Sequence, residues 1–334
     1  MGPGHNVPDT ERTPAERKAA SEKAGDHAPA TDAATLRHHV EYWAMRGLAF
    51  IVRLMPIDLA SVLFGRIWAL LAPLTRRQQR ADRHLAMAMP DLSPDERARI
   101  IHEMWMNYGR VMAETFHLDH LSEDVTRVQV EPVTADTFIR VERQAVFVSL
   151  HMANWEVAIV AGRNYGVRPT SVYQAVQNPL IDAWLWKMRR PLYGALLAKS
   201  PHIARSLLAG IKRGGTIAVL GDLREAAGVE VPFFGMPALA NAFPAVLARS
   251  SGAPLVAVRV RRLEGGARFL IDSAPIEVPE TDDRQADIVA ATAALHQQFE
   301  TWIRENPGQW MWTHRKWAIK HPKRGVQRRA ATQS

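Results

Sequence analysis

A histidine and a carboxylate stand five positions apart, directly after an apolar run of the chain. Residues 145–150 form the run, His151 follows it, and Glu156 completes the pair. Within one helix this spacing would turn the two side chains about 140° apart. If His151 lies in a turn and Glu156 in the first turn of a helix, the carboxylate can fold back onto the imidazole. Such a pair makes a general base with a fixed tautomer and a stabilised charged form, although a surface histidine beside an acid shows the same spacing.

The elements that would position this pair follow from the pattern of apolar residues. Residues 145–150 are typical of a buried strand, and Asn154 is a good N-cap for a helix over about 154–163. Residues 216–220 predict a second buried strand, which ends beside Asp222. Further strands are expected over 170–173, 255–260 and 268–272, and helices over about 94–116, 178–189, 204–212, 242–249 and 288–305. This alternation predicts an α/β fold, with a mixed, largely buried central sheet flanked by helices.

Composition excludes several chemistries. The chain of 334 residues has no cysteine, which rules out disulfides, thiolate zinc sites and a cysteine nucleophile. There is no Gly-x-Ser-x-Gly elbow, Walker loop or dinucleotide fingerprint, which counts against a serine hydrolase, an NTPase and a dinucleotide enzyme. His117 and His120 have no further ligands at suitable spacing. We therefore expect neither a metal ion nor a cofactor.

The net charge of +8 suits nucleic acid, an anionic membrane or an acidic protein equally, so the location of the charge has to decide. Arg76, Arg77, Arg80 and Arg83 cluster just after a strongly apolar segment, as expected of a cytoplasmic flank against anionic headgroups. No nucleic-acid recognition motif accompanies the charge. An anionic membrane surface is thus an expected partner, and nucleic acid is not.

The chain divides into four parts by composition. Residues 1–34 have almost no large apolar side chains, and we expect them to be disordered. Residues 35–75 predict membrane-anchor helices that meet near Pro56, although arginines interrupt them and a pair of buried core helices fits as well. Residues 76–320 form the expected catalytic domain, and residues 321–334 a basic flexible tail. No signal peptide is visible, so the protein is expected to stay on the cytoplasmic side.

Four short stretches, taken together, carry a resemblance to a known family. His151 and Glu156 match an HxxxxE box, and residues 173–180 (YQAVQNPL) are similar to a Tyr-Arg-Pro-x-x-Asn-Pro-Leu segment. Residues 231–235 read VPFFG, and residues 307–317 (PGQWMWTHRKW) resemble a closing Pro-x-Gln-Trp-x-Trp-x-His-Arg-Arg-Trp box. In this order the boxes resemble the bacterial lipid A biosynthesis acyltransferases, the lauroyl/myristoyl transferase group. The resemblance extends over roughly residues 40–320.

The resemblance implies transfer of a fatty acyl chain from an acyl carrier protein thioester to a hydroxyl of a lipid A precursor. The reaction would take place at the cytoplasmic face of the cell inner membrane. In this interpretation His151 removes the proton of the acceptor hydroxyl, and Glu156 orients His151 and stabilises its imidazolium. The alcohol itself is the nucleophile, so no covalent acyl-enzyme is needed.

The same boxes suggest residues that contact substrate. The seven candidates are Asn154, Trp155, Gln174, Asn178, Arg189, Asp222 and Arg224. Gln174 stands where the family usually has an arginine, so Arg189 and Arg190 are candidates to replace that arginine at the oxyanion or at a phosphate of the acceptor, although each also fits an ordinary solvated arginine. Asp222 is expected to position the acceptor or Arg224, although a plain turn at a strand end fits equally.

Two other functions stay open from the sequence. One is an acyltransferase that acts on a different glycolipid, a phospholipid or an amino lipid, which the change at Gln174 slightly favours. The other is a non-catalytic lipid-binding homologue, in which His151 and Glu156 would be dispensable.

Overall fold

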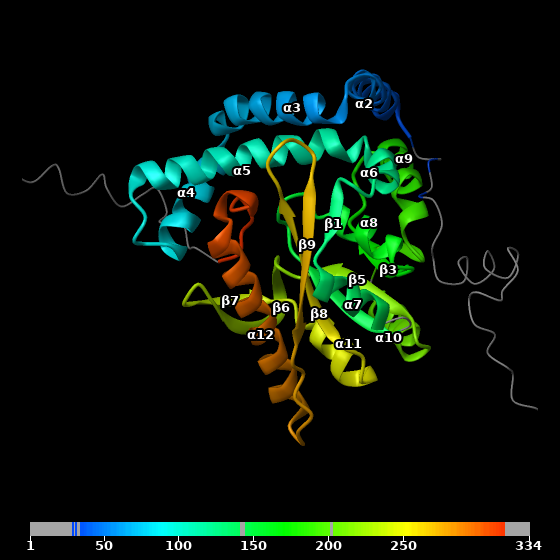
Figure 1. Cartoon of the computed structure of the whole chain (residues 1–334), viewed down its shortest axis with the longest axis vertical. Helices are drawn as coiled ribbons and strands as arrows, with labels where there is room; N and C mark the ends of the chain where they lie inside the picture. Colours follow the sequence, from blue (N-terminus) through cyan, green and yellow to red (C-terminus); the bar gives the residue numbers. More distant parts are fainter. Residues whose placement is uncertain (1–28, 30, 32–33, 141–143, 201–202, 318–334) are drawn as a thin grey trace, which may run out of the picture.

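The computed structural model describes residues 29, 31, 34–140, 144–200 and 203–317. Most of the extension predicted over 1–34, and all of the tail predicted over 321–334, lie outside these residues. The described part holds a central sheet of seven strands in the order β1-β9-β8-β2-β5-β3-β4, with helices on both sides (Figure 1). These strands are β1 (Val128–Val130), β2 (Ala145–Ser149), β3 (Thr170–Tyr173), β4 (Ala195–Ala198), β5 (Thr216–Leu220), β8 (Leu255–Arg262) and β9 (Phe269–Ile276).

The sheet is mixed, as predicted. Neighbouring strands are parallel except β8 and β9, which pair antiparallel. A separate two-stranded antiparallel sheet joins β6 (Arg224–Phe233) to β7 (Met236–Ala240). Its turn is Phe234-Gly235, and both residues have positive φ, 52° and 69°, as a tight two-residue hairpin requires. The VPFFG stretch thus ends β6 and makes this turn.

Strand β2 lies in the middle of the fold and is buried along its whole length. Val146 and Val148 belong to an apolar cluster that includes residues of α10 (Ile203–Lys212), α11 (Phe243–Ser251) and α12 (Arg284–Glu305). The alternate residues Ala145 and Phe147 belong to a second cluster with α7 (Pro132–Arg140) and α8 (Val157–Asn164). Because successive side chains of a strand point to opposite faces, the sheet lies between two helical layers. The predicted α/β fold is confirmed.

Helix α8 begins three residues later than predicted. Ala153 has a left-handed backbone with φ 47°, and the side chain of Asn154 accepts a hydrogen bond from the backbone of Glu156 at 3.2 Å. Asn154 therefore closes a turn before the helix instead of capping it. The strands predicted over 170–173 and 216–220 are found at those residues as β3 and β5.

The N-terminal apolar segment forms two helices, α2 (Leu36–Leu54) and α3 (Ile57–Leu71), which meet at Pro56 as predicted. Helix α3 lies along α5 (Pro94–Thr115), as Figure 1 shows. Within the described residues one stretch, Ile57–Leu74, is long and apolar enough to cross a membrane, and 33% of it is buried in the protein. The remaining helices are α4 (Arg76–Ala88), α6 (Leu118–Glu123) and α9 (Pro179–Arg189).

The close contact between α3 and α5 depends on glycine. A side chain at Gly109 would collide with the carbonyl of Phe64 and would lie 2.6 Å from Cβ of Trp68. The contact is reinforced by the Ser61 hydroxyl, which donates to Glu114 of α5 at 2.6 Å.

We expect Gly109→Ala to lower the free energy of unfolding by roughly 1–3 kcal/mol, because the added methyl overpacks the helix contact. The matched control is Gly210→Ala in α10, where nothing lies within 4 Å of the added Cβ. That control should gain about 0.5–1 kcal/mol from the higher helix propensity of alanine. Denaturant unfolding of both variants in detergent measures the difference. Equal effects at the two glycines would contradict the close contact.

Candidate active site

His151 and Asp222 meet at the carboxyl-terminal ends of two neighbouring parallel strands. In the β2–β5 pair Ser149 lies opposite Leu220, so the residues that follow each strand come to the same edge of the sheet. The Asp222 carboxylate binds the imidazole Nδ1 of His151 at 2.8 Å and accepts from the His151 backbone N–H at 3.0 Å. With Nδ1 bound to the carboxylate, Nε2 is left as the basic nitrogen of a neutral imidazole.

Asp222 is buried, with 1% of its surface exposed, and takes a third hydrogen bond from the indole Nε1 of Trp310 at 2.9 Å. Burial alone would raise the pKa of this carboxyl. The charges of His151 and His314, together with hydrogen bonds from His151 and Trp310, hold the pKa well below its usual range instead. Asp222 is therefore an ionised acid that fixes the orientation of His151.

Glu156 does not make the predicted contact with His151. Its carboxylate forms a buried, two-pronged ion pair with Arg189, whose Nε lies 2.9 Å from Oε2. The turn closed by Asn154 directs Glu156 toward the end of α9, where Arg189 is the last residue. The prediction that Glu156 orients His151 is wrong for this structure, because Asp222 occupies that place. Asp222 was predicted to position the acceptor or Arg224; in the structure its hydrogen bonds go to His151 and Trp310, and its contact with the acceptor stays a prediction.

Two predicted substrate residues, the asparagines, are held by the framework. Asn154 is fully buried and donates to the carboxylate of Glu114 at 2.9 Å. Asn178 caps α9 by accepting from the backbone of Leu180, and its amide donates to the His38 carbonyl of α2 at 2.9 Å. These contacts give both asparagines a structural role.

Three other candidates stand in different settings. Arg189, expected at the oxyanion or at a phosphate, is engaged by Glu156. Gln174 and Arg224 are exposed. Gln174 lies just after β3, and Arg224 begins β6, two residues after Asp222.

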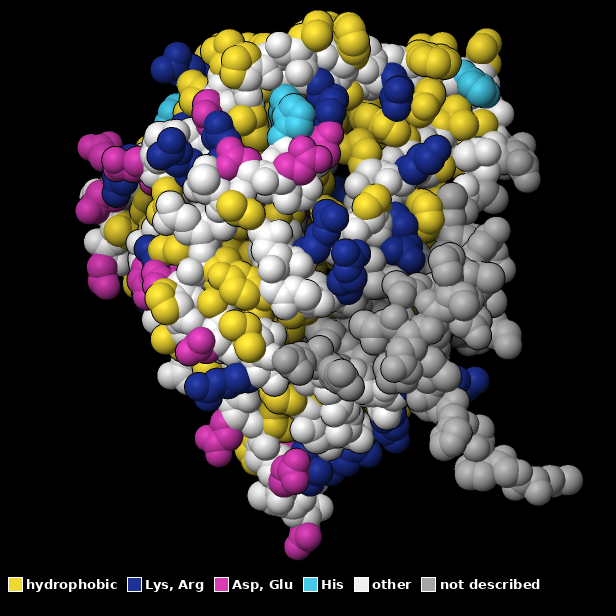
Figure 2. Space-filling model, turned by 45° about the vertical axis from the view of Figure 1, so that its right-hand side comes forward, with side chains coloured by type: hydrophobic (Ala, Val, Ile, Leu, Met, Phe, Trp, Pro, Cys, Tyr) yellow, Lys and Arg dark blue, Asp and Glu magenta, His cyan; other side chains and the backbone are white. Residues whose placement is uncertain are grey.

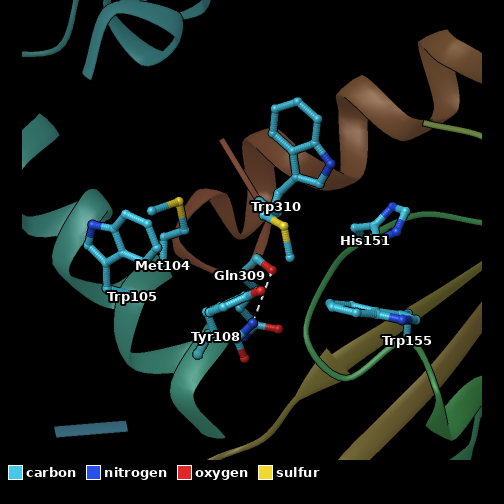
Figure 3. Close-up of a pocket in the computed structure, with 9 residues that line it drawn as sticks. Met104, Trp105, Tyr108, His151, Trp155, Gln309 and Trp310 are labelled. Carbon is cyan, nitrogen blue, oxygen red and sulfur yellow. Dashed lines mark hydrogen bonds between the residues drawn. The ribbon is translucent and has the colours of Figure 1, made fainter. Parts of the chain in front are cut away.

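Trp155 lines a hollow in front of His151. Its ring centre lies 5.0 Å from that of His151. Figure 3 shows these two side chains facing Met104, Trp105 and Tyr108 of α5 across the hollow. The hollow has about 240 Å³ of empty space, part of it open to solvent. His151 thus stands beside a wall of apolar and aromatic side chains, an arrangement that can hold an apolar ligand next to an imidazole.

The closing box of the sequence supplies groups to the site that the sequence interpretation had not singled out as site residues. The backbone of Met311 donates to the carbonyl of His151 at 3.2 Å, and Trp310 binds Asp222. The ring of His314 lies 5.0 Å from that of His151. Burial lowers the pKa of His314 to about 4, so it is neutral at pH 7. The signal that pointed to these residues was the Trp-x-Trp-x-His spacing itself.

A buried lysine lies behind this site. Lys316 is fully buried, and its Nζ is 2.9 Å from Nε2 of His296 and 5.0 Å from the ring centre of Phe233. The ring of Phe233 in turn packs edge-on against Trp310. Burial lowers the pKa of Lys316 from 10.5 to about 8, and burial together with the charge of Lys316 lowers that of His296 to about 3. His296 therefore accepts a hydrogen bond from the lysine as a neutral ring.

The lowered pKa of Lys316 predicts a pH-dependent stability. Between about pH 8 and 10.5 the unfolded chain holds a proton on Lys316 that the folded chain has lost. The free energy of unfolding should therefore rise by roughly 3 kcal/mol over this window, and lie lower by that amount below it. Urea unfolding of the wild type and Lys316→Met at pH 7.5, 9 and 10.5 measures it. The difference between the two proteins should change with pH, and parallel curves would refute the shift.

Comparison with known proteins gives one consistent result. Residues 30–318 match the family described as bacterial lipid A biosynthesis acyltransferase. The lipid A biosynthesis palmitoleoyltransferase of Escherichia coli (strain K12) is 26% identical over 295 residues, which cover 83% of this chain and 92% of that protein. The lipid A biosynthesis lauroyltransferase of the same organism is 25% identical over 300 residues, with the same coverage. A phosphatidylinositol mannoside acyltransferase of Mycolicibacterium smegmatis is 27% identical over 280 residues, 80% of this chain and 88% of that protein.

Proposed function

We propose, from the premise that the chain belongs to the bacterial lipid A biosynthesis acyltransferase family, that it moves a fatty acyl chain from an acyl carrier protein thioester to a hydroxyl of a lipid A precursor. The family supports acyl transfer to lipid A or a related glycolipid. The single observation that carries the finer proposal is the His151–Asp222 pair, which combines a basic nitrogen with a buried ionised acid beside an apolar hollow.

In the proposed mechanism Nε2 of His151 takes the proton of the acceptor hydroxyl as its oxygen attacks the thioester carbonyl carbon. The tetrahedral intermediate then collapses with cleavage of the carbon–sulfur bond, and the imidazolium returns the proton to the departing sulfur. Asp222 stabilises the imidazolium and holds the ring in place. His314 stays neutral beside it and adds no second positive charge. The acceptor oxygen is the nucleophile, so the protein forms no covalent intermediate.

The outer side of α2 and α3 supports a membrane-bound location. Large apolar side chains are exposed along both helices, and Figure 2 shows hydrophobic side chains gathered along this edge of the molecule. The most exposed are Leu36, Val40, Trp43, Phe50, Leu54 and Leu70, together with Leu74 in the short 3-10 turn that follows α3. Such an apolar face above a soluble domain fits a helical pair that lies in the membrane interface. We place the domain at the cytoplasmic face of the inner membrane.

A cationic patch supports an acidic carrier protein as the donor. The patch consists of Arg76, Arg77, Arg80, Arg83 and Arg315, and within the described residues no carboxylate pairs with them. Arg77 and Arg80 are near enough to act on the pKa of His314. Arg80 also donates to the carbonyl of Thr313 at 3.1 Å, which joins α4 to the closing box. Positive charge so close to the site would attract an acidic protein that delivers the acyl chain.

A second acceptor class has one observation in its favour. The mycobacterial relative is named for a phosphatidylinositol mannoside acceptor, and it is as similar to this chain as the lipid A enzymes are. The same His151–Asp222 chemistry would serve either hydroxyl.

We expect His151→Ala to abolish transfer, and Asp222→Asn to lower kcat by roughly 10²–10⁴ with little change in KM, because the amide cannot stabilise the imidazolium. Glu156→Gln should act differently. It leaves the buried Arg189 charge without its partner, so its main effect should be a loss of stability of about 3–5 kcal/mol. The assay uses detergent-solubilised protein, an acylated carrier protein and a lipid A precursor.

Melting temperatures of the three variants separate the two effects. A wild-type kcat in Asp222→Asn would contradict the orienting role of Asp222. A folded Glu156→Gln that is as inactive as His151→Ala would indicate that Glu156 orients His151 instead. No product from the wild type with any acylated carrier would count against the proposed donor and acceptor.

We expect the double variant Leu54→Asp/Leu70→Asp to bind vesicles of phosphatidylethanolamine and phosphatidylglycerol at least tenfold more weakly than the wild type, because each leucine buried in lipid contributes about 1.5–3 kcal/mol. The control is Val133→Asp/Ile139→Asp on α7, two apolar residues that are also exposed, 72% and 51%. Flotation of each protein with the vesicles measures binding. Similar losses in both double variants would argue against an apolar membrane face on α2 and α3.

A further inference from the structure

A second hollow lies next to the catalytic one, on the side of the protein that carries α3. It is enclosed by α3, α5 and the loop between β8 and β9, which reaches up over α5 in Figure 1. It has about 960 Å³ of empty space and is open to solvent. Gln309 lines both hollows, so the two share a wall.

The lining includes an arginine, Arg110, with a buried nitrogen that lacks a hydrogen-bond partner in the described part of the chain. The side chain of Arg110 projects from α5 over Gly65, where a Cβ would lie only 3.0 Å from its Cγ. Its Nε is buried and has no hydrogen-bond partner in the described part of the chain. No carboxylate among the described residues forms an ion pair with it. Burial and the charge of Arg262 lower its pKa, and the opposing charge of Glu114 offsets this effect only in part.

The neighbouring acids are already engaged. Glu114 is buried and accepts hydrogen bonds from the two terminal guanidinium nitrogens of Arg262, from Ser61 and from Asn154. Asp58, at the edge of the hollow, binds Arg127 at 2.9 and 3.0 Å and the backbone N–H of Ala267 at 2.7 Å.

Glu264 also lines the hollow but is exposed on its loop. Among the buried or half-buried charged side chains that line the hollow, Arg110 is therefore the one for which the described residues supply no ion pair.

We propose that Arg110 binds a phosphate group of the acceptor glycolipid in this second hollow. The inference rests on the proposed function, because it assumes a phosphorylated acceptor lipid that occupies both hollows. Its phosphate would lie in the second hollow and its reacting hydroxyl beside His151, on the two sides of Gln309. The planar guanidinium, whose Nε has no partner in the described part of the chain, can bind two oxygens of a phosphate at once. The position beside α3 puts this phosphate at the level of the headgroups.

The test measures binding without an acyl donor, so it does not depend on catalysis. The full chain in detergent is titrated with a phosphorylated glucosamine disaccharide lipid and with its dephosphorylated counterpart, and tryptophan fluorescence reports binding. Arg110→Met should weaken affinity for the phosphorylated lipid about tenfold and leave that for the dephosphorylated lipid unchanged, because one charge-assisted contact is lost. Arg205→Met removes an exposed charge from α10 and should change neither affinity.

Equal affinity of the wild type and Arg110→Met for the phosphorylated lipid would overturn the proposal, as would equal affinity of the wild type for the two lipids. Arg110→Lys keeps the charge without the planar fork and should weaken binding several-fold, so it decides the matter if Arg110→Met does not fold. Micelles of phosphatidylglycerol and inorganic phosphate serve as competitors. Full competition by either would assign the site to bulk lipid or free phosphate and overturn the assignment to the acceptor.

The two proposals fail separately. Arg110-dependent binding in a protein that transfers no acyl chain would support this site and refute the proposed reaction. Acyl transfer with Arg110-independent binding would do the reverse.

Discussion

A carboxylate that is both buried and ionised sets the geometry of the site. Moving such a group out of water costs several kcal/mol unless hydrogen bonds replace the lost hydration. Asp222 has three donors: the ring and the backbone of His151, and the indole of Trp310. These donors come from the end of β2 and from the closing box of the chain, so the acid joins segments that are far apart in the sequence. The orientation of the His151 ring is thus a consequence of supplying hydrogen bonds to one buried carboxylate.

Two further buried carboxylates differ from Asp222 in the partner that they bind. Glu156 is paired with Arg189, and Glu114 with Arg262, each through two guanidinium nitrogens. Pairs of this kind lock their partners in place, because removal of one member leaves an unpaired charge in the interior. Asp222 alone of the three is bound to an imidazole, the group that in the proposed mechanism takes and returns a proton. The buried carboxylate that has no arginine partner is therefore the one that binds His151.

The sequence was enough to predict five of the seven strands of the central sheet and the position of His151 at a strand end, but not the side chain that binds it. β3 and β5 were predicted because short apolar runs are local signals, and His151 because it ends such a run. Glu156 was chosen as the partner because it is near in sequence, whereas Asp222 is 71 residues away and becomes a neighbour only through the parallel pairing of β2 and β5. Similarly, Asn154 was predicted as a helix cap from its residue type and position. Its hydrogen bond to Glu114, which lies 40 residues away in the chain, could not be predicted from a local pattern.

The same limit explains why the sequence alone did not decide whether the N-terminal helices are membrane-anchor helices or core helices of the protein. Apolar composition is alike in a membrane span and in a helix packed on a protein, and Ile57–Leu74 satisfies both. The polar contacts of α3 distinguish them. Ser61 donates to the buried Glu114, and Asp58 binds Arg127, so a helix withdrawn alone into lipid would leave these groups without their partners. Polar groups without partners are costly in hydrocarbon, which for the proposed membrane-bound state favours an α3 that stays on α5 and turns its outer side to the lipid.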